Sequence, residues 1–213
     1  MKAALALAET KRRAYYRIFG GDRALAGLLR PGMRVLDVGC SDGRGSMELT
    51  GAFGCDVHRP TLQVARDAGR RRPVAQADVR HLPYRDGAFD VVVALDVIEH
   101  FDKPDALVVL DEMERVSRNT VVVVTPSGFV PQPPTETEPW QEHRCGFEAD
   151  ELSDRGFDVR GLGGWSSLRG DYGAFKAGPL GQLAAVLSEP YVRGDANRAF
   201  HLLAVKHVRS HVD

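Results

Sequence analysis

The sequence carries almost no net charge, so it has no excess of positive charge to attract a polyanion. Its 28 lysines and arginines are balanced by 29 aspartates and glutamates, which gives a formal net charge of −1. Non-specific binding to nucleic acid depends on a broad positive field that such a chain lacks. The three arginines at 70–72 lie at the end of an expected helix, where basic side chains are normally solvated. We therefore expect no nucleic-acid partner.

Cysteines and long apolar runs are also scarce. The three cysteines (Cys40, Cys55 and Cys145) have no paired spacing, which argues against a disulfide framework or a CxxC zinc module. No stretch approaches the roughly 20 apolar residues of a membrane-spanning helix. The opening residues MKAALALA hold an apolar run that is too short for a signal peptide, and ETKRR follows at once. We expect a cytoplasmic protein with no membrane partner.

The sequence does contain a repeated alternation of apolar runs and helical patterns. Short apolar runs at 34–38, 74–77, 91–95 and 121–125 are typical of buried parallel strands. Helical patterns lie between them, and the segment 200–207 reads as a C-terminal strand antiparallel to its neighbours. This order predicts a doubly wound α/β sheet. The helices between these strands are expected over 61–71 and 104–116, and further helices over 3–19, 22–29, 148–154 and 180–187. Another strand is expected over 158–162, and the glycine-rich segment 161–181 is interpreted as a long connection.

The segment VLDVGCSDG, residues 35–43, carries the strongest functional signal. Asp37 stands two residues before Gly39, and small residues follow at Gly39, Ser41 and Gly43. This is not the GxGxxG spacing of dinucleotide-binding proteins, which argues against a nicotinamide oxidoreductase. The segment resembles motif I of class I S-adenosylmethionine-dependent methyltransferases, usually written (D/E)xGxGxG. The resemblance implies that the methionine part of the cofactor lies against this turn, with Asp37 near its amino-acid end.

Further segments between about residues 30 and 127 resemble the same family in register. Asp56, in GCDV, would end the second strand and bind both ribose hydroxyls; Asp78 would end the third strand and face the adenine amino group. TPSG at 125–128 follows the expected fifth strand, as in the family. The resemblance also assigns to the cofactor site Cys40, Val57, Val79 and Leu95.

Two features depart from the family pattern. Ser41 replaces the middle glycine, which is tolerable if its backbone angles stay ordinary. The 13 positions from Gly43 to Asp56 are fewer than usual, so either the first helix is brief or the assignment of Asp56 is shifted.

Catalytic residues can leave little trace in a methyltransferase, because the sulfonium donor is already activated and alignment is the main task. A general base is needed when the acceptor must lose a proton. His100, in DVIEH, and His143, in PWQEHRCGF, are the candidates. The alternatives are that His100 packs on the cofactor or satisfies a loop carbonyl, and that His143 anchors its loop. Four aromatic residues either wall the acceptor site or pack this layer: Phe129, Trp140, Trp165 and Tyr172.

A metal is the less favoured alternative. Asp96, Glu99 and His100 resemble the carboxylate and histidine set associated with divalent metal in ubiquinone-type O-methyltransferases. However, a Glu-His pair after this strand is widespread in methyltransferases that use no such metal, and we expect none. The chain also lacks the (N/D/S)PP(Y/F) motif of enzymes that methylate exocyclic amines of nucleic-acid bases.

We therefore expect one domain over 1–213, with a helical cap at 1–30, a cofactor-binding core at 31–127 and acceptor-side loops and strands at 128–213. The resemblance implies a Rossmann-like, seven-stranded, mostly parallel sheet with an antiparallel last strand. It also implies S-adenosylmethionine-dependent methylation of an O or N atom of a small molecule in a biosynthetic pathway, with S-adenosylhomocysteine as product, by a monomer or homodimer. The alternative is a non-catalytic S-adenosylmethionine sensor or partner subunit.

Overall fold

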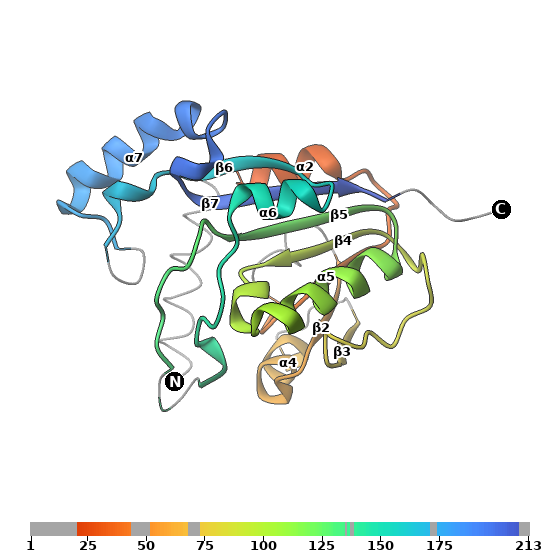
Figure 1. Ribbon diagram of the computed structural model, residues 1–213. Coiled ribbons are helices and arrows are strands. Elements are labelled where there is room, and N and C mark those ends of the chain that lie inside the picture. Colours follow the sequence, from red (N-terminus) through yellow and green to blue (C-terminus); the bar gives the residue numbers. More distant parts are fainter. Residues whose placement is uncertain are drawn as a thin grey trace. The chain divides into compact units, whose positions relative to one another are not determined.

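The computed structural model describes residues 21–43, 52–67, 73–134, 136, 139–170 and 174–208 (Figure 1). Seven strands are seen in these ranges: β1 (Val35–Val38), β2 (Phe53–Asp56), β3 (Val74–Gln76), β4 (Phe89–Leu95), β5 (Ser117–Pro126), β6 (Asp158–Trp165) and β7 (Ala199–His207). The helices are α2 (Gly21–Leu28), α4 (Arg59–Asp67), α5 (Lys103–Val116), α6 (Ala149–Asp154) and α7 (Gly178–Val192). Short 3-10 turns are η1 (Ile98–His100), η2 (Pro139–Gln141), η3 (Ser166–Leu168) and η5 (Ala196–Arg198).

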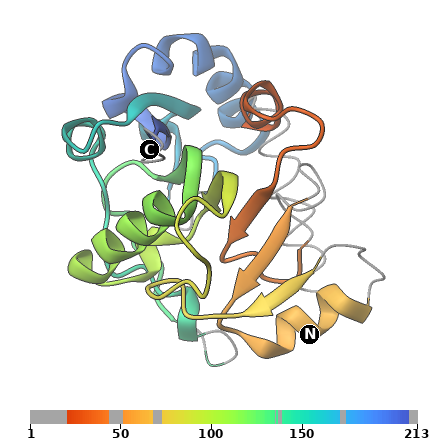
Figure 2. The same cartoon turned by 90° about the vertical axis from the view of Figure 1, so that its right-hand side faces the viewer.

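The strand order confirms the predicted sheet. It reads β3-β2-β1-β4-β5-β7-β6. β1 pairs in parallel with β2 and with β4, β2 pairs in parallel with β3, and β6 pairs antiparallel with β7. Figure 2 shows β1, β2 and β3 side by side at one end of this order. The sheet is therefore seven-stranded and mostly parallel, with antiparallel pairing at the end of the chain, as in Rossmann-like methyltransferases.

The chain divides into two compact units. The first contains residues 1–95, 111–121 and 207–213, and the second contains residues 96–110 and 122–206. In the first unit β1 is buried along its whole length and β4 nearly so, which explains why apolar residues dominate both strands. The expectation of a single domain in three parts stays a prediction.

In the second unit α7 packs directly on β6, and two glycines allow the contact. A Cβ at Gly161 would lie 2.2 Å from the carbonyl oxygen of Val192, and one at Gly164 would lie 2.3 Å from that of Ala185. Gly164 also has a φ of +70°, a backbone angle that residues with a side chain rarely adopt. The glycines that made this region look like a loop are therefore packing sites, and β6 runs on to Trp165 instead of ending at 162.

Element boundaries differ from prediction in a few places. The helix expected to stop before Pro190 continues to Val192, because the backbone N–H of Arg193 still reaches the carbonyl of Glu189 at 3.4 Å. β3 ends at Gln76, two residues short of Asp78. The expected helix at 3–19 and the arginines at 70–72 lie outside the described residues. None of the helices in the described part of the chain has the length and apolar character that crossing a membrane requires.

Candidate functional site

The turn after β1 alternates between ordinary and left-handed backbone. Gly39, Ser41 and Gly43 have φ values of 69°, 51° and 73°. The backbone N–H of Gly43 donates to the carbonyl of Cys40 at 2.9 Å and closes the turn. The condition of ordinary backbone angles at Ser41 is not met, because the turn places this residue in the region that glycine adopts without strain. Residues 44–51, which follow the turn, lie outside the described ranges.

Asp56 ends β2, as predicted, and its carboxylate holds this turn. Oδ2 accepts the backbone N–H of Ser41 at 2.8 Å, and Oδ1 accepts the backbone N–H of His58 at 2.8 Å. The first bond compensates in part for the unfavourable backbone of Ser41. Each carboxylate oxygen has two acceptor lone pairs, so Asp56 retains capacity for two further donors.

Asp37 and Cys40 form the buried base of the turn. Asp37 lies on β1 between Gly54 of β2 and Val93 of β4, and its side chain is buried. The N–H of Cys40 donates to the carbonyl of Cys55 at 3.0 Å. Burial, reinforced by the nearby charge of Asp37, raises the pKa of both thiols far above the usual range. Cys40 is therefore a neutral packing residue.

Asp78 lies in the turn after β3 and is held by a neighbour in sequence. Arg80 donates to its carboxylate from the backbone N–H at 3.0 Å, from Nε at 3.1 Å and from Nη2 at 2.7 Å. The side-chain hydrogen bond from Arg80 is the main cause that lowers the pKa of Asp78. Of the apolar residues predicted for the cofactor site, Val79 and Leu95 are buried, whereas Val57 is 61% exposed.

In the second unit, Glu99 joins η1 to the segment that carries His143. Its side chain is buried, and Oε2 accepts the hydroxyl of Thr125 at 3.0 Å. Its backbone carbonyl accepts the N–H groups of Arg144 at 2.8 Å and Cys145 at 3.3 Å. A loop that is distant in sequence is thus fixed beside η1.

The two predicted histidines come together in this region. His100 Nδ1 lies 3.0 Å from the carbonyl of Glu142, and His143 Nδ1 lies 2.7 Å from that of Val130. Their ring centroids are 4.9 Å apart in an edge-to-face arrangement. Because a carbonyl oxygen can accept but not donate, both Nδ1 atoms carry a proton, and Nε2 of His143 bears a lone pair when its ring is neutral.

The two interpretations of His143, as a loop anchor and as a general base, involve different nitrogen atoms of its ring. Nδ1 of His143 anchors the loop, as the structural alternative expects, while Nε2 retains the lone pair that a general base requires. Loss of solvation on burial is the main cause that lowers the pKa of His143, whereas its hydrogen bond to Val130 acts in the opposite sense. His143 is therefore neutral at neutral pH.

One group in the described part of the chain has the spacing of a metal site. Ligand atoms of Glu99, His100 and His143 all lie within 4.8 Å of one another. Asp96, which the family pattern would place in such a set, instead has its Oδ1 3.3 Å from Nε2 of His201. These donors would suit zinc or another divalent transition metal. The expectation that no metal is used stays a prediction.

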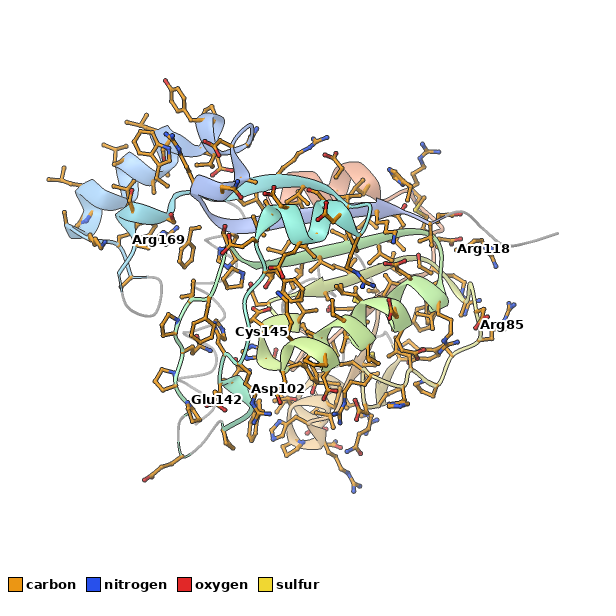
Figure 3. All side chains as sticks on the ribbon, in the orientation of Figure 1. Arg85, Asp102, Arg118, Glu142, Cys145 and Arg169 are labelled. Atoms are coloured by element: carbon orange, nitrogen blue, oxygen red, sulfur yellow. The ribbon has the colours of Figure 1, made fainter. Side chains whose placement is uncertain are left out.

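Sequence reasoning missed several buried polar residues in this unit, among them His201 and Arg169. His201 lies on β7 and pairs with Asp96. Arg169 lies after η3, with its guanidinium 3.7 Å from the ring centre of Phe175 and 4.6 Å from that of Phe200 (Figure 3). A polar residue inside an apolar strand was a usable signal for His201, whereas nothing near Arg169 in the sequence indicated its burial.

The structure describes three of the four aromatic residues that are candidates for the wall of the acceptor site. Phe129, Trp140 and Trp165 all keep exposed ring surface. Tyr172 lies outside the described residues.

Comparison with known proteins addresses the segment from β1 to β5. Residues 36–125 match the family model described as a methyltransferase domain. This part of the chain is therefore similar to methyltransferase domains. Methyltransferase GfsG of Streptomyces halstedii is 41% identical over 98 residues, which cover 41% of this chain and 34% of GfsG. The probable tRNA methyltransferase 9B of Mus musculus is 35% identical over 92 residues, covering 41% of this chain and 20% of that protein.

The match in structure extends beyond the methyltransferase domain. A chain of the complex between the Haloferax volcanii Trm112 methyltransferase activator and a methyltransferase aligns with 99% of this chain and 97% of its own length. The TM-score is 0.63 at 18% identity, which shows the fold alone. The fold is that of class I S-adenosylmethionine-dependent methyltransferases. The matched part of this chain spans 34% of the first of the curated relatives named above and 20% of the second.

Proposed function

We propose that the chain transfers the methyl group of S-adenosylmethionine to a small-molecule acceptor. The observation that supports this most directly is the turn at 39–43, tied to Asp56 at the carboxyl ends of two adjacent parallel strands. Ligands of open α/β sheets bind at this edge. Because glycines with positive φ stand at both ends of this turn, its backbone can be approached closely by a ligand.

The same residues suggest how the cofactor is held. The backbone of Gly39, Cys40, Ser41 and Gly43 would lie against the methionine part, with Asp37 at its amino-acid end. Asp56 would accept the two ribose hydroxyls with the lone pairs that its bonds to Ser41 and His58 leave available. Asp78, oriented by Arg80, would face the adenine amino group. Apolar contacts would come from Val57, Val79 and Leu95.

In the proposed reaction, His143 Nε2 takes the proton from an O–H or N–H group of the acceptor, and His100 is the second candidate base. The acceptor atom forms a bond to the methyl carbon as the carbon–sulfur bond breaks. The electron pair of that bond remains on sulfur, which becomes the neutral thioether of S-adenosylhomocysteine. No Lewis acid is required, because the leaving group is already a sulfonium.

The proposed acceptor is a small molecule, and a tRNA is the second candidate. The relative named as a probable tRNA methyltransferase favours RNA. The net charge of −1 and the absence of the (N/D/S)PP(Y/F) motif favour a small molecule instead. We propose a cytoplasmic enzyme in a biosynthetic pathway, a monomer or homodimer without nucleic-acid or membrane partners. A non-catalytic S-adenosylmethionine sensor is the remaining alternative.

Calorimetric titration with S-adenosylmethionine and S-adenosylhomocysteine, with NAD as control, tests the cofactor. Binding of the first two without the third supports the proposal, and absence of binding by folded protein overturns it. An acceptor screen by mass spectrometry follows. Methylated small molecules support the proposed class, methylated tRNA overturns it, and binding without any product favours the sensor.

A further inference from the structure

The strand pair β6 and β7 ends at a pocket lined in part by Trp165, one of the candidate acceptor-wall aromatics. Trp165, the last residue of β6, pairs with Ala199, the first residue of β7. η3 follows Trp165 directly, and η5 directly precedes Ala199. Between them lies a pocket of about 390 Å³, lined by Trp165, Ser166, Ser167, Asn197 and Arg198.

The pocket lies at the edge of the sheet where β5 ends. Ser127, the first residue after β5, donates its backbone N–H to the carbonyl of Phe200 at 3.0 Å. Its hydroxyl donates to the carbonyl of Ala196, the first residue of η5, at 3.5 Å. The carboxyl end of a parallel strand thus adjoins the turn that forms one side of the pocket. This is the edge at which α/β sheets bind their ligands.

One wall of the pocket offers an aromatic face. Trp165 is 39% exposed, and its ring centroid lies 6.2 Å from that of Tyr191 on α7, which is 70% exposed. Two neighbouring rings therefore leave apolar area in water. A flat apolar ligand laid against Trp165 would remove part of that area from solvent.

The polar part of the lining carries one positive charge and no carboxylate. The Arg198 guanidinium, the Asn197 amide and the hydroxyls of Ser166 and Ser167 can all donate hydrogen bonds. Asp195, outside the lining, pairs with Arg198 Nε at 3.0 Å, but both side chains are largely exposed. Such a pair is weak, and a guanidinium has five donors, so Arg198 can accommodate a second anion.

We propose that this pocket binds a planar aromatic anion, with the ring against Trp165 and the anionic group toward Arg198. The binding step stands on the pocket alone. Its meaning for catalysis rests on the proposed function: the methyl acceptor is then an aromatic carboxylate that bears the nucleophilic hydroxyl or amine.

The test uses two probes that share a ring system and differ in charge, added to the full chain without S-adenosylmethionine. Anilinonaphthalene sulfonate is the anion, and N-phenylnaphthylamine is its uncharged counterpart. Trp165→Ala should weaken both by about fivefold or more, because both lose the ring contact. Arg198→Gln should weaken the sulfonate by a similar factor and leave the uncharged probe unchanged.

The chain offers a matched control for each variant. Trp140 is 40% exposed, close to the value for Trp165, and does not line the pocket. Arg160 forms an exposed ion pair with Asp158 two residues away, much as Arg198 pairs with Asp195. Trp140→Ala and Arg160→Gln should leave the affinity for both probes unchanged.

A measurement on the unaltered protein covers the case in which a variant fails to fold. The chain has two tryptophans, so its indole N–H groups give two resonances. The sulfonate should shift that of Trp165 and not that of Trp140. The proposal is overturned if the shift falls on Trp140, or if folded variants at 165 and 198 bind the sulfonate as the unaltered chain does. Failure of S-adenosylmethionine to bind would sink the proposed function and leave this pocket untouched.

Discussion

The turn after β1 and the loop that carries His143 are held in place in different ways. In the turn, the residues that shape the backbone are its own glycines, and the carboxylate that ties it down stands at the end of the next strand. His143 depends on the carbonyl of Val130 and on bonds that its neighbours make to Glu99, 45 residues before Arg144. The turn is specified by short-range sequence, whereas the histidine is positioned by long-range contacts.

The difference affects what a substitution can be expected to do. Removing a group from the turn alters one ligand contact and the local backbone together. Removing the imidazole of His143 removes a proton acceptor and also the anchor of its own loop, which lies far from the turn in sequence. The two kinds of damage can be separated by measuring cofactor affinity, turnover and stability side by side.

The largest expected effect is on turnover in His143→Ala. Loss of the general base should lower turnover about 100- to 10,000-fold, while affinity for S-adenosylmethionine stays unchanged. His207→Ala is the control, because His207 is exposed on β7 and has no proposed role. If unfolding free energy falls and turnover per folded molecule does not, His143 serves as an anchor only.

The pH dependence of turnover provides a second test of the same residue. The base form of His143 is the neutral ring, and burial lowers its pKa below the usual value of 6.5. Turnover should therefore stay level as pH falls to 6.5, and below the lowered pKa it should fall about tenfold per pH unit. Steady-state turnover is measured as a function of pH, over the range in which the protein stays folded. If turnover already falls at a pH above 6.5, the assignment is contradicted. The residual turnover of His143→Ala should not show this fall.

On the side of the turn, Asp56→Ala should weaken S-adenosylmethionine binding by about tenfold or more. The ribose loses its acceptors, and the N–H groups of Ser41 and His58 lose theirs. Calorimetry of the variant against Asp67→Ala, an exposed acid on α4, isolates the effect. Equal affinity in the two variants would show that the ribose lies elsewhere.

The smallest effect is expected from Ser41→Gly. Glycine adopts the observed φ of 51° without strain, so the free energy of unfolding should rise by about 1 kcal/mol. Ser41→Ala keeps the Cβ and should show no such gain. Urea denaturation measures both variants, and a glycine variant less stable than the parent would mean that the serine side chain contributes more than its backbone costs.

Much of the turn and its sheet could be predicted from sequence, because the determinants are close together in the chain. β1, β4 and β5 from Thr120 onward are mostly apolar in sequence because they are largely buried. β2 ends at Asp56, as the resemblance implied. The left-handed backbone of Ser41 could not be predicted, since the bond that compensates for it comes from a carboxylate 15 residues away.

The second unit was harder to predict, because its contacts also join residues that are far apart in the sequence. Arg169 is buried because Phe175 and Phe200 flank it, and the second of these is 31 residues away on another strand. His100 and His143 were recognised singly, but their contact depends on how the loop docks on η1. Gly161 and Gly164 suggested a loop, because nothing local shows that α7 will press against them.

The bond between Asp56 and Ser41 also bears on when the turn loses its conformational freedom. Because the bond forms within the chain itself, that entropy is lost during folding and not at the moment a ligand arrives. A ligand that meets a rigid turn retains more of its contact energy as affinity. A short turn without the middle glycine of the family pattern can therefore serve a binding site well, provided that a residue at a neighbouring strand end holds its backbone.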